Sequence, residues 1–175
     1  MADAPRFLAD AMLGRLARWL RTLGYDTAYD PSVHDPALVA RADAEGRVLL
    51  TRDRRLVADL RPARSVLVRS GVPLAQLREV AEACGLGRPP GPFARCTVCN
   101  GALRPATAAE VAALVPERVR ERGGAVRRCP SCGRAYWDGS HTRRMRATLA
   151  AALPAWAGLA APPGRLGQGT SATSG

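Results

Sequence analysis

The stretch GRVLLTRD, residues 46–53, gives the clearest indication of the fold in this sequence. Its centre, Val48–Thr51, is a short uncharged run of the kind that forms a buried β-strand. Gly46 in front of it is a typical stop for a preceding helix, and Asp53 behind it precedes a second helical segment. A buried strand with a helix on each side is the repeating unit of an α/β domain.

The sequence on both sides of this stretch repeats the same alternation. Predicted strands lie at residues 6–9, 25–29, 48–51 and 65–68, and predicted helices at residues 12–23, 36–44, 54–60 and 73–84. The first helix has an apolar stripe at helical spacing, and Gly24 follows it as a C-cap. This order predicts an α/β domain with a mainly parallel sheet, which we assign to residues 1–88.

The second half of the chain is organised around two C-x-x-C pairs. Residues 85–92, GLGRPPGP, form a linker by composition, and the pairs Cys96/Cys99 and Cys129/Cys132 follow it. A glycine follows each pair within two residues, which suits a tight turn that points both sulfurs toward one ion. Four thiolates leave no open coordination position, so we predict one structural zinc ion.

Alternatives remain for these cysteines. The pairs are separated by 29 residues, which exceeds the roughly 15–20 residues of common zinc ribbons. The thiols could also be unmetallated or redox-active, although two such pairs in a reducing compartment favour a metal. Cys84 lies on an apolar helix face and is predicted to be a buried bystander.

Helical signals lie within and after the cysteine module. Thr107 and Glu110 form a capping-box pattern, which predicts a short helix inside the insert. Residues 140–153 have a helical pattern and carry three arginines. We therefore assign a zinc ribbon plus C-terminal helix to residues 93–153. The segment 157–175 is rich in small residues and has no periodicity, which predicts a disordered tail.

The charge of the chain is strongly positive and unevenly distributed. The 175 residues include 26 arginines, no lysine and 15 acids, for a net charge of +11. Residues 1–90 carry 14 arginines and 11 acids (net +3), and residues 91–175 carry 12 arginines and 4 acids (net +8). Codon bias explains the preference for arginine, but arginine also binds phosphate bidentately. The basic second half therefore indicates a polyanionic partner, most simply a nucleic acid.

No segment of the sequence suggests a membrane or a secretory route. No apolar run approaches the roughly 20 residues that span a bilayer. The N-terminus, MADAPRFLAD, has no apolar region of the signal-peptide type. We expect a cytoplasmic protein without a membrane partner.

Three aspartates stand at the ends of predicted elements. Asp10 follows the first strand, Asp35 begins the second helix, and Asp53 follows the third strand. The loops after parallel strands meet at one edge of the sheet, where ligands bind. Clustered carboxylates favour Mg²⁺ or Mn²⁺, which activate water for phosphodiester cleavage. Each aspartate also precedes a helix, where Asp is a favoured N-cap worth about 1 kcal/mol, so capping is a competing interpretation.

The order and spacing of several motifs resemble the Mut7-C RNase domain family, whose members join a PIN-like nuclease domain to a zinc ribbon. The similar segments are residues 7–21 (FLADAMLGRLARWLR), 23–26 (LGYD), 46–53 (GRVLLTRD), 96–101 (CTVCNG), 129–134 (CPSCGR), 136–141 (YWDGSH) and 144–145 (RM). They extend over about residues 6–146. The 29-residue insert between the cysteine pairs also matches the pattern of that family.

The resemblance implies a PIN-like three-layer α/β/α fold, a small zinc ribbon and metal-dependent cleavage of RNA. It makes Asp10 and Asp53 the expected Mg²⁺ or Mn²⁺ ligands, with Asp35 the third catalytic acid and Asp43 its competitor. PIN-like sites usually have a fourth acid, for which Asp59 is available.

Arg15, Arg18 and Arg52 are the residues that we expect to bind the RNA backbone. Arg15 and Arg18 could equally form the solvated face of the first helix. The function that this set of residues predicts is a metal-dependent ribonuclease assisted by a zinc ribbon. A non-catalytic RNA-binding protein with a degenerate PIN-like site is the alternative. A toxin-like PIN protein with an antitoxin partner is a third possibility, for which no residue argues specifically.

Overall fold

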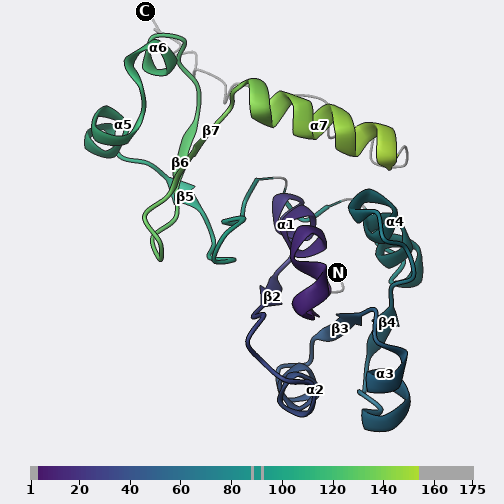
Figure 1. Ribbon diagram of the computed structural model, residues 1–175. Coiled ribbons are helices and arrows are strands. Elements are labelled where there is room, and N and C mark those ends of the chain that lie inside the picture. The colour runs from purple at the N-terminus through teal and green to yellow at the C-terminus, as the bar shows by residue number, and fades with distance from the viewer. Residues whose placement is uncertain (1–3, 88, 92, 154–175) are drawn as a thin grey trace, which may run out of the picture.

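The computed structural model describes residues 4–87, 89–91 and 93–153. Its larger sheet has four parallel strands in the order β2-β1-β3-β4. These strands are β1 (Phe7–Ala9), β2 (Thr27–Tyr29), β3 (Val48–Thr51) and β4 (Ser65–Leu67). The strands alternate with the 3-10 helix η1 (Ala11–Leu13) and the helices α1 (Gly14–Thr22), α2 (Asp35–Ala44), α3 (Arg54–Leu60) and α4 (Pro73–Ala83). The predicted α/β organisation with a mainly parallel sheet is confirmed (Figure 1).

Alternate residues of the short strands belong to two separate apolar cores, one on each face of the sheet. In β1, Phe7 and Ala9 belong to one core, which also contains buried residues of α1 and α4. Leu8 belongs to the other core, which α2 and α3 cover. The same alternation occurs in β3, because side chains along a strand point to opposite faces of the sheet. Strands buried on both faces are the reason that residues 48–51 form an uninterrupted uncharged run.

The first helical segment is divided where the sequence predicts one helix. The Asp10 side chain accepts a hydrogen bond from the Met12 backbone N–H at 2.9 Å, and this cap starts the 3-10 turn before α1. The other predicted strands and helices of this domain agree with the structure to within about two residues at each end, the usual scatter of such boundaries.

Strand order identifies the edge of the sheet at which a ligand fits. The connection after β1 leads through α1 to β2 on one side, and the connection after β3 leads through α3 to β4 on the other. The connections after the adjacent strands β1 and β3 therefore lead to opposite sides of the sheet order. In open parallel sheets, such a switch point forms a crevice at the carboxyl ends of the strands. Asp10 and Asp53 follow these two strands.

The second half of the chain forms a three-stranded antiparallel ribbon. Its strands are β5 (Arg104–Pro105), β6 (Val126–Arg128) and β7 (Ala135–Trp137), in the order β5-β6-β7. The insert contains α5 (Ala108–Leu114), which the Thr107/Glu110 capping box starts as predicted, and α6 (Glu117–Arg120), which the sequence analysis did not predict. The ribbon and its insert lie to one side of the four-stranded sheet (Figure 1).

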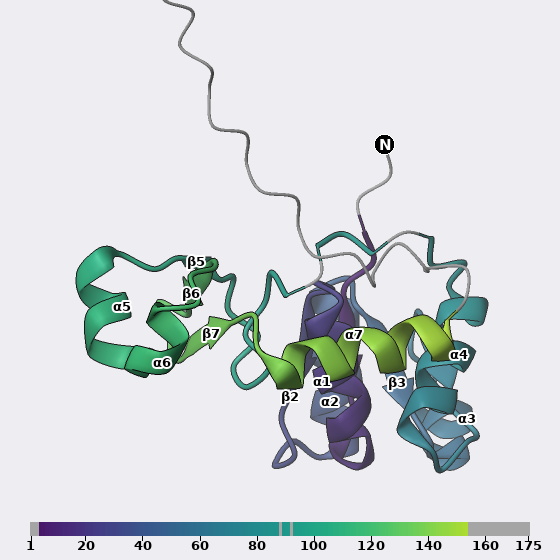
Figure 2. The ribbon, with the colours of Figure 1, turned by 90° about the horizontal axis from the view of Figure 1, so that it is seen from above.

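The last described helix, α7 (Ser140–Ala152), returns from the ribbon to the first domain (Figures 1 and 2). Its C-terminal end contributes Leu149, Ala152 and Leu153 to the core that contains α1 and α4. Arg78 of α4 donates two hydrogen bonds to the Ala152 carbonyl, at 3.1 and 3.3 Å. The helix predicted as part of the ribbon unit therefore also completes the core of the α/β domain. The predicted disordered tail, 157–175, lies outside the described residues.

A buried arginine joins the ribbon to the α/β domain. Arg21 of α1 is only 4% exposed, and its guanidinium donates to the carbonyls of Thr27, Thr97 and Val98 at 2.8–3.1 Å. The end of the predicted linker is also attached, because the Gly91 N–H donates to the Leu23 carbonyl at 3.4 Å and the Phe93 N–H, just after the linker, donates to the Thr22 carbonyl at 2.7 Å. Residues 97–98 belong to the first cysteine turn, so this turn is held against α1 and β2.

A second contact at the same joint is centred on the Asp26 carboxylate and Asn100. Asn100 donates from its amide to Asp26 at 2.8 Å and accepts from the Thr27 N–H at 3.0 Å, which covers the free edge of β2. Arg47 donates to the Asp26 carboxylate at 2.7 Å. Burial alone raises the pKa of Asp26, but the hydrogen bonds from Arg47 and Asn100 outweigh it, and the pKa lies below its usual value.

No helix of the described residues combines the length and the hydropathy that a bilayer crossing requires.

We expect Asp26→Asn to lower the free energy of unfolding at pH 7 by about 1–3 kcal/mol, because it removes a charged hydrogen-bond acceptor from Arg47. A carboxyl with a lowered pKa stabilises the fold above its unfolded pKa of about 3.9, and this contribution disappears as the pH falls through the folded pKa. The difference between the two proteins should therefore be constant from pH 7 to 5 and shrink below pH 4. Urea unfolding at each pH measures it; a difference that grows on acidification contradicts the assignment.

Candidate functional site

Asp10 lies at the switch point and is largely buried, with 7% of its surface exposed. Its Oδ1 accepts from the Met12 N–H at 2.9 Å, and its Oδ2 accepts from the Thr51 hydroxyl at 2.5 Å and from the Arg52 N–H at 3.1 Å. The carboxylate therefore ties the end of β1 to the end of β3. Two carboxylate oxygens offer about four acceptor positions, so these three bonds leave one position free.

Asp53 is connected to Asp10 through one hydroxyl group. The buried Thr51 donates its hydroxyl proton to Asp10, and the same oxygen accepts from the Asp53 N–H at 2.9 Å. The Asp53 Oδ1 caps α3 by accepting from the N–H groups of Arg55 and Leu56 at 2.7 and 3.2 Å. Both aspartates thus have the capping role that competed with metal binding in the sequence analysis, and both keep unused acceptor capacity.

The structure separates the remaining predicted acids. Asp35 is exposed and is the first residue of α2, with His34 at the N-cap, so it begins at the same edge of the sheet. Asp43 lies near the other end of α2 and accepts from the Ala63 N–H at 3.0 Å before β4, so it does not compete with Asp35. Asp59 is six residues along α3 from Asp53, about 9 Å along the helix axis, and does not supply a fourth acid.

Sequence reasoning missed one acid at this edge. Asp30 follows β2 directly, and the parallel register that pairs Ala9 with Tyr29 makes Asp30 the counterpart of Asp10 on the neighbouring strand. Hydrogen bonds from the Ser32 hydroxyl and N–H lower the pKa of Asp30. The signal was its position directly after a strand, which was the rule that selected Asp10. Even so, the acids of the described residues do not form a group of three close enough to share an ion.

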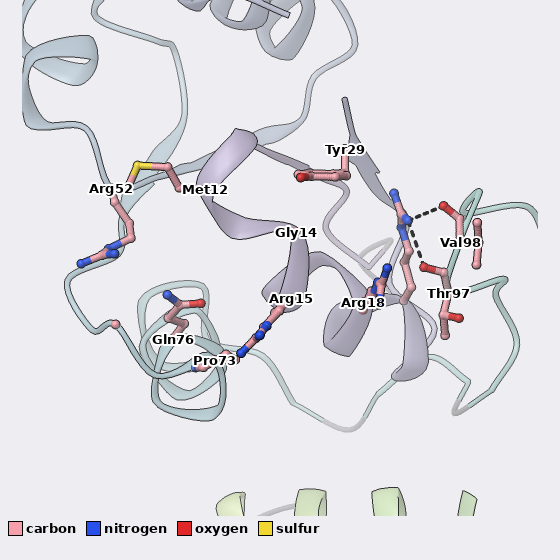
Figure 3. A pocket seen from close by; sticks show the side chains of 12 residues that line it. Met12, Gly14, Arg15, Arg18, Tyr29, Arg52, Pro73, Gln76, Thr97 and Val98 are labelled. Atoms are coloured by element: carbon pink, nitrogen blue, oxygen red, sulfur yellow. Dashed lines mark hydrogen bonds between the residues drawn. The ribbon is translucent and has the colours of Figure 1, made fainter. Parts of the chain in front are cut away.

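A groove of about 480 Å³ adjoins this edge. Arg15, Arg18 and Arg52, the three residues predicted to bind the RNA backbone, all line it (Figure 3). Arg15 and Arg18 are exposed on α1. Among the described residues that line the groove, four are arginines and none is an acid. The groove therefore has the charge that a phosphate chain requires.

Both parts of the chain contribute to the walls of this groove. Gly71, Pro73 and Gln76 line it at the start of α4, and Thr97 and Val98 line it from the first cysteine turn (Figure 3). Figure 3 also shows the Arg21 bonds that hold this turn. The ribbon is therefore part of the groove and not a separate module beside it.

The start of α1 has a glycine because Tyr29 packs directly over it. A Cβ on Gly14 would lie 2.9 Å from the Tyr29 ring, well inside a normal contact distance. The Tyr29 hydroxyl donates to the Ala11 carbonyl at 3.2 Å, and the ring lines the groove. Gly14 thus allows an aromatic side chain to lie beside Arg15 and Arg18.

The arginines of α7 contribute less to an RNA surface than their spacing indicates. Arg146 lies over the Phe93 ring, 5.0 Å from its centre, and 3.5 Å from the Asp138 carboxylate. Its side chain is mostly buried, so it is a structural residue. Arg143 and Arg144 remain exposed.

The four cysteines of the two pairs come together as predicted. Their sulfur atoms all lie within 4.8 Å of one another, with Cys96 to Cys132 at 3.5 Å and Cys99 to Cys129 at 3.3 Å. A tetrahedral zinc site with Zn–S bonds of about 2.3 Å separates its sulfurs by about 3.8 Å, so this set can hold a metal ion such as zinc. The structure contains no other group of three or more such ligands in its described part.

Two further details fit a metal at this position. A Cβ on Gly101 would lie 3.2 Å from the Cys129 sulfur and 3.0 Å from the Ser131 hydroxyl, which explains the glycine after the first pair. The Tyr136 hydroxyl lies 3.0 Å from the Cys96 sulfur and can donate a hydrogen bond to a thiolate there. Hydrogen bonds of this kind orient metal ligands.

Together, the fold and the site define an α/β protein with carboxylates at a switch point, a cationic groove beside them, and a four-cysteine ribbon that forms one wall. The sequence model of the Mut7-C RNAse domain family matches residues 5–149, and the chain belongs to this family. The resemblance found in the sequence is thereby confirmed, and it indicates an RNase-type function with RNA as the substrate. No curated protein and no solved structure matches the chain significantly.

We expect the purified protein to contain one equivalent of zinc per chain, measured by plasma mass spectrometry. Cys96→Ser should lose most of this zinc and lower the melting temperature, because the metal holds the turn that Arg21 binds. Cys84→Ser is the matched control, since Cys84 packs partly buried against the first core and away from the sulfur cluster. Equal zinc content in the wild-type protein and Cys96→Ser contradicts the site.

Proposed function

We propose that this chain is a divalent-metal-dependent ribonuclease with a PIN-like α/β domain, and that its zinc ribbon assists RNA binding. One observation carries the proposal. The backbone N–H of Arg52 bonds to the Asp10 carboxylate, while the Arg52 side chain lines the cationic groove. Arg52 therefore connects the Asp10 carboxylate to the surface that we propose binds phosphate. An RNA chain in the groove passes directly beside the carboxylates.

Asp10 and Asp53 are the residues that we propose as ligands of Mg²⁺ or Mn²⁺. Mg²⁺ is usually held by one or two carboxylates and keeps several waters, so two acids at the switch point fit its chemistry. Both carboxylates keep acceptor positions that their capping bonds do not use. When bound, such an ion activates water and stabilises the departing oxygen. We propose Asp35 as the third acid, and Asp30 is available on the adjacent strand.

The arginines have the complementary task of binding and orienting the phosphate chain. Arg15 and Arg18 project from α1 into the groove (Figure 3), and Arg52 lines it where its backbone N–H bonds to Asp10. Guanidinium groups bind phosphate oxygens in pairs and so fix the orientation of the backbone. The Thr51 hydroxyl donates a hydrogen bond to the Asp10 carboxylate, which keeps this side chain in one orientation.

A non-catalytic RNA-binding protein is the second candidate function, and one observation favours it. No three acids of the described chain are close enough to share an ion, and Asp10 and Asp53 both form complete helix caps. In this case the groove binds RNA and the aspartates serve the fold alone.

A cleavage assay distinguishes the two functions. We expect wild-type protein to cut labelled single-stranded RNA with Mn²⁺, and the Asp10→Asn, Asp53→Asn double variant to be slower by at least about a hundredfold, because both charges are lost. Each asparagine keeps one acceptor oxygen for its helix cap, although at position 10 the bond from the Arg52 N–H is lost. Asp59→Asn, on the same helix as the Asp53 cap, is the control that should retain activity. Melting curves confirm that each variant is folded.

The outcomes of this assay are separable. Equal products from the wild-type protein and the double variant contradict the metal-nuclease proposal. If neither protein cuts RNA and both bind it in a salt-sensitive manner, the RNA-binding function is supported instead.

The role of the groove gives an independent prediction. Replacement of both Arg15 and Arg18 by alanine should weaken RNA binding and reduce the slope of log K against log salt by about 1.4, because two phosphate contacts are lost. Arg64→Ala is the control, since Arg64 is exposed in the loop before β4, away from the groove. Fluorescence anisotropy between 50 and 300 mM salt measures both; an unchanged slope in the double variant refutes the assigned contacts.

A further inference from the structure

A buried amide lines the groove on its α4 side. Gln76 is only 4% exposed, yet it lines the groove from the first turns of α4. Its Nε2 donates to the Ser70 carbonyl at 2.9 Å. Across the described residues, no buried side-chain oxygen or nitrogen lacks a hydrogen-bond partner. Since no described group bonds to the Gln76 Oε1, this acceptor reaches the open groove, and one of the two Nε2 hydrogens is not used by Ser70.

The bond to Ser70 fixes the direction of this amide. A carbonyl only accepts hydrogen bonds, so the NH₂ end of Gln76 must face Ser70 and the oxygen must point elsewhere. The amide therefore cannot exchange its two ends without losing the bond. A fixed acceptor beside a fixed donor is suited to recognise a defined polar edge of a ligand.

One exposed apolar side chain lines the same groove as this amide. Met12 lines the groove and is 65% exposed, although it is a large apolar residue. Figure 3 shows Met12 and Gln76 on opposite sides of one open space, with Arg52 at its margin.

We propose that Met12 and Gln76 form a subsite for one unpaired nucleobase, a proposal that rests on RNA binding in the groove. A base has apolar faces and a polar edge, which match the Met12 side chain and the Gln76 amide. Its edge is free only in single-stranded nucleic acid. Adenine is the best match, because glutamine pairs bidentately with its N6 and N7 atoms.

With this subsite, the arginines and the amide of the groove have different roles in binding RNA. Arg15 and Arg52 bind phosphates without regard to sequence, and Gln76 adds a preference at one nucleotide position. A good bidentate pair of this kind is expected to discriminate against other bases by roughly tenfold or more.

Fluorescence anisotropy with short RNAs tests this subsite. The probes are a uridine nonamer and three nonamers in which one central uridine is replaced by A, C or G, in buffer without added Mg²⁺ or Mn²⁺. We expect wild-type protein to bind the A-containing RNA roughly tenfold more tightly than the uridine nonamer. Gln76→Met and Met12→Ala should each lose most of this ratio and still bind the uridine nonamer.

Matched variants keep the result interpretable. Val98→Ala removes an exposed apolar side chain at the ribbon end of the same groove and should leave the base preference unchanged. Met12→Ala alters an exposed side chain and therefore decides the question if Gln76→Met fails to fold. Equal affinity for the four RNAs, or a preference that survives both subsite variants, overturns the subsite while leaving RNA binding intact. If wild-type protein binds none of the RNAs, the proposed function fails together with the subsite.

Discussion

The hydrogen bonds of the buried Asp10 carboxylate are the interaction on which the rest of the site depends. They join the end of β1, the first turn of η1 and the end of β3 at one point. A polar group with little exposure is stable only when it is hydrogen-bonded, and the Thr51 hydroxyl and two N–H groups donate to this carboxylate. Because the same bonds set the start of η1, they also set the direction of α1 and with it the positions of Arg15 and Arg18.

The groove depends in turn on the joint between the two halves of the chain. Arg21 is buried in this joint, and its hydrogen bonds to three carbonyl groups satisfy most of its donors. Burial lowers the pKa of Arg21, but an arginine remains charged at neutral pH. The joint places the first cysteine turn against α1, so a metal bound at the cysteines would stabilise one wall of the groove. The first cysteine turn therefore lines one end of the groove, and Arg52, which bonds to Asp10, lines the other.

Much of the fold could be predicted from the sequence because its signals are local. Buried strands, helix caps and the two C-x-x-C pairs depend on neighbouring residues, and the structure agrees with them closely. Other features could not be predicted in this way. Asp35 and Asp43 lie near opposite ends of α2, and the direction of this helix relative to the sheet decides which of them lies at the edge with Asp10 and Asp53. Gln76 looks like an ordinary helix residue until the groove beside α4 is known.

By itself, the sequence determined the α/β class, the cysteine cluster, the aspartates after β1 and β3, and the family, since each follows from local pattern and spacing. The tertiary structure alone decided that α7 completes the first core, that Arg146 is buried while Arg15 and Arg18 line the groove, and that the ribbon forms one of its walls. These features join residues that are far apart along the chain. Their energies depend on packing and charge pairing in three dimensions, which no local pattern encodes.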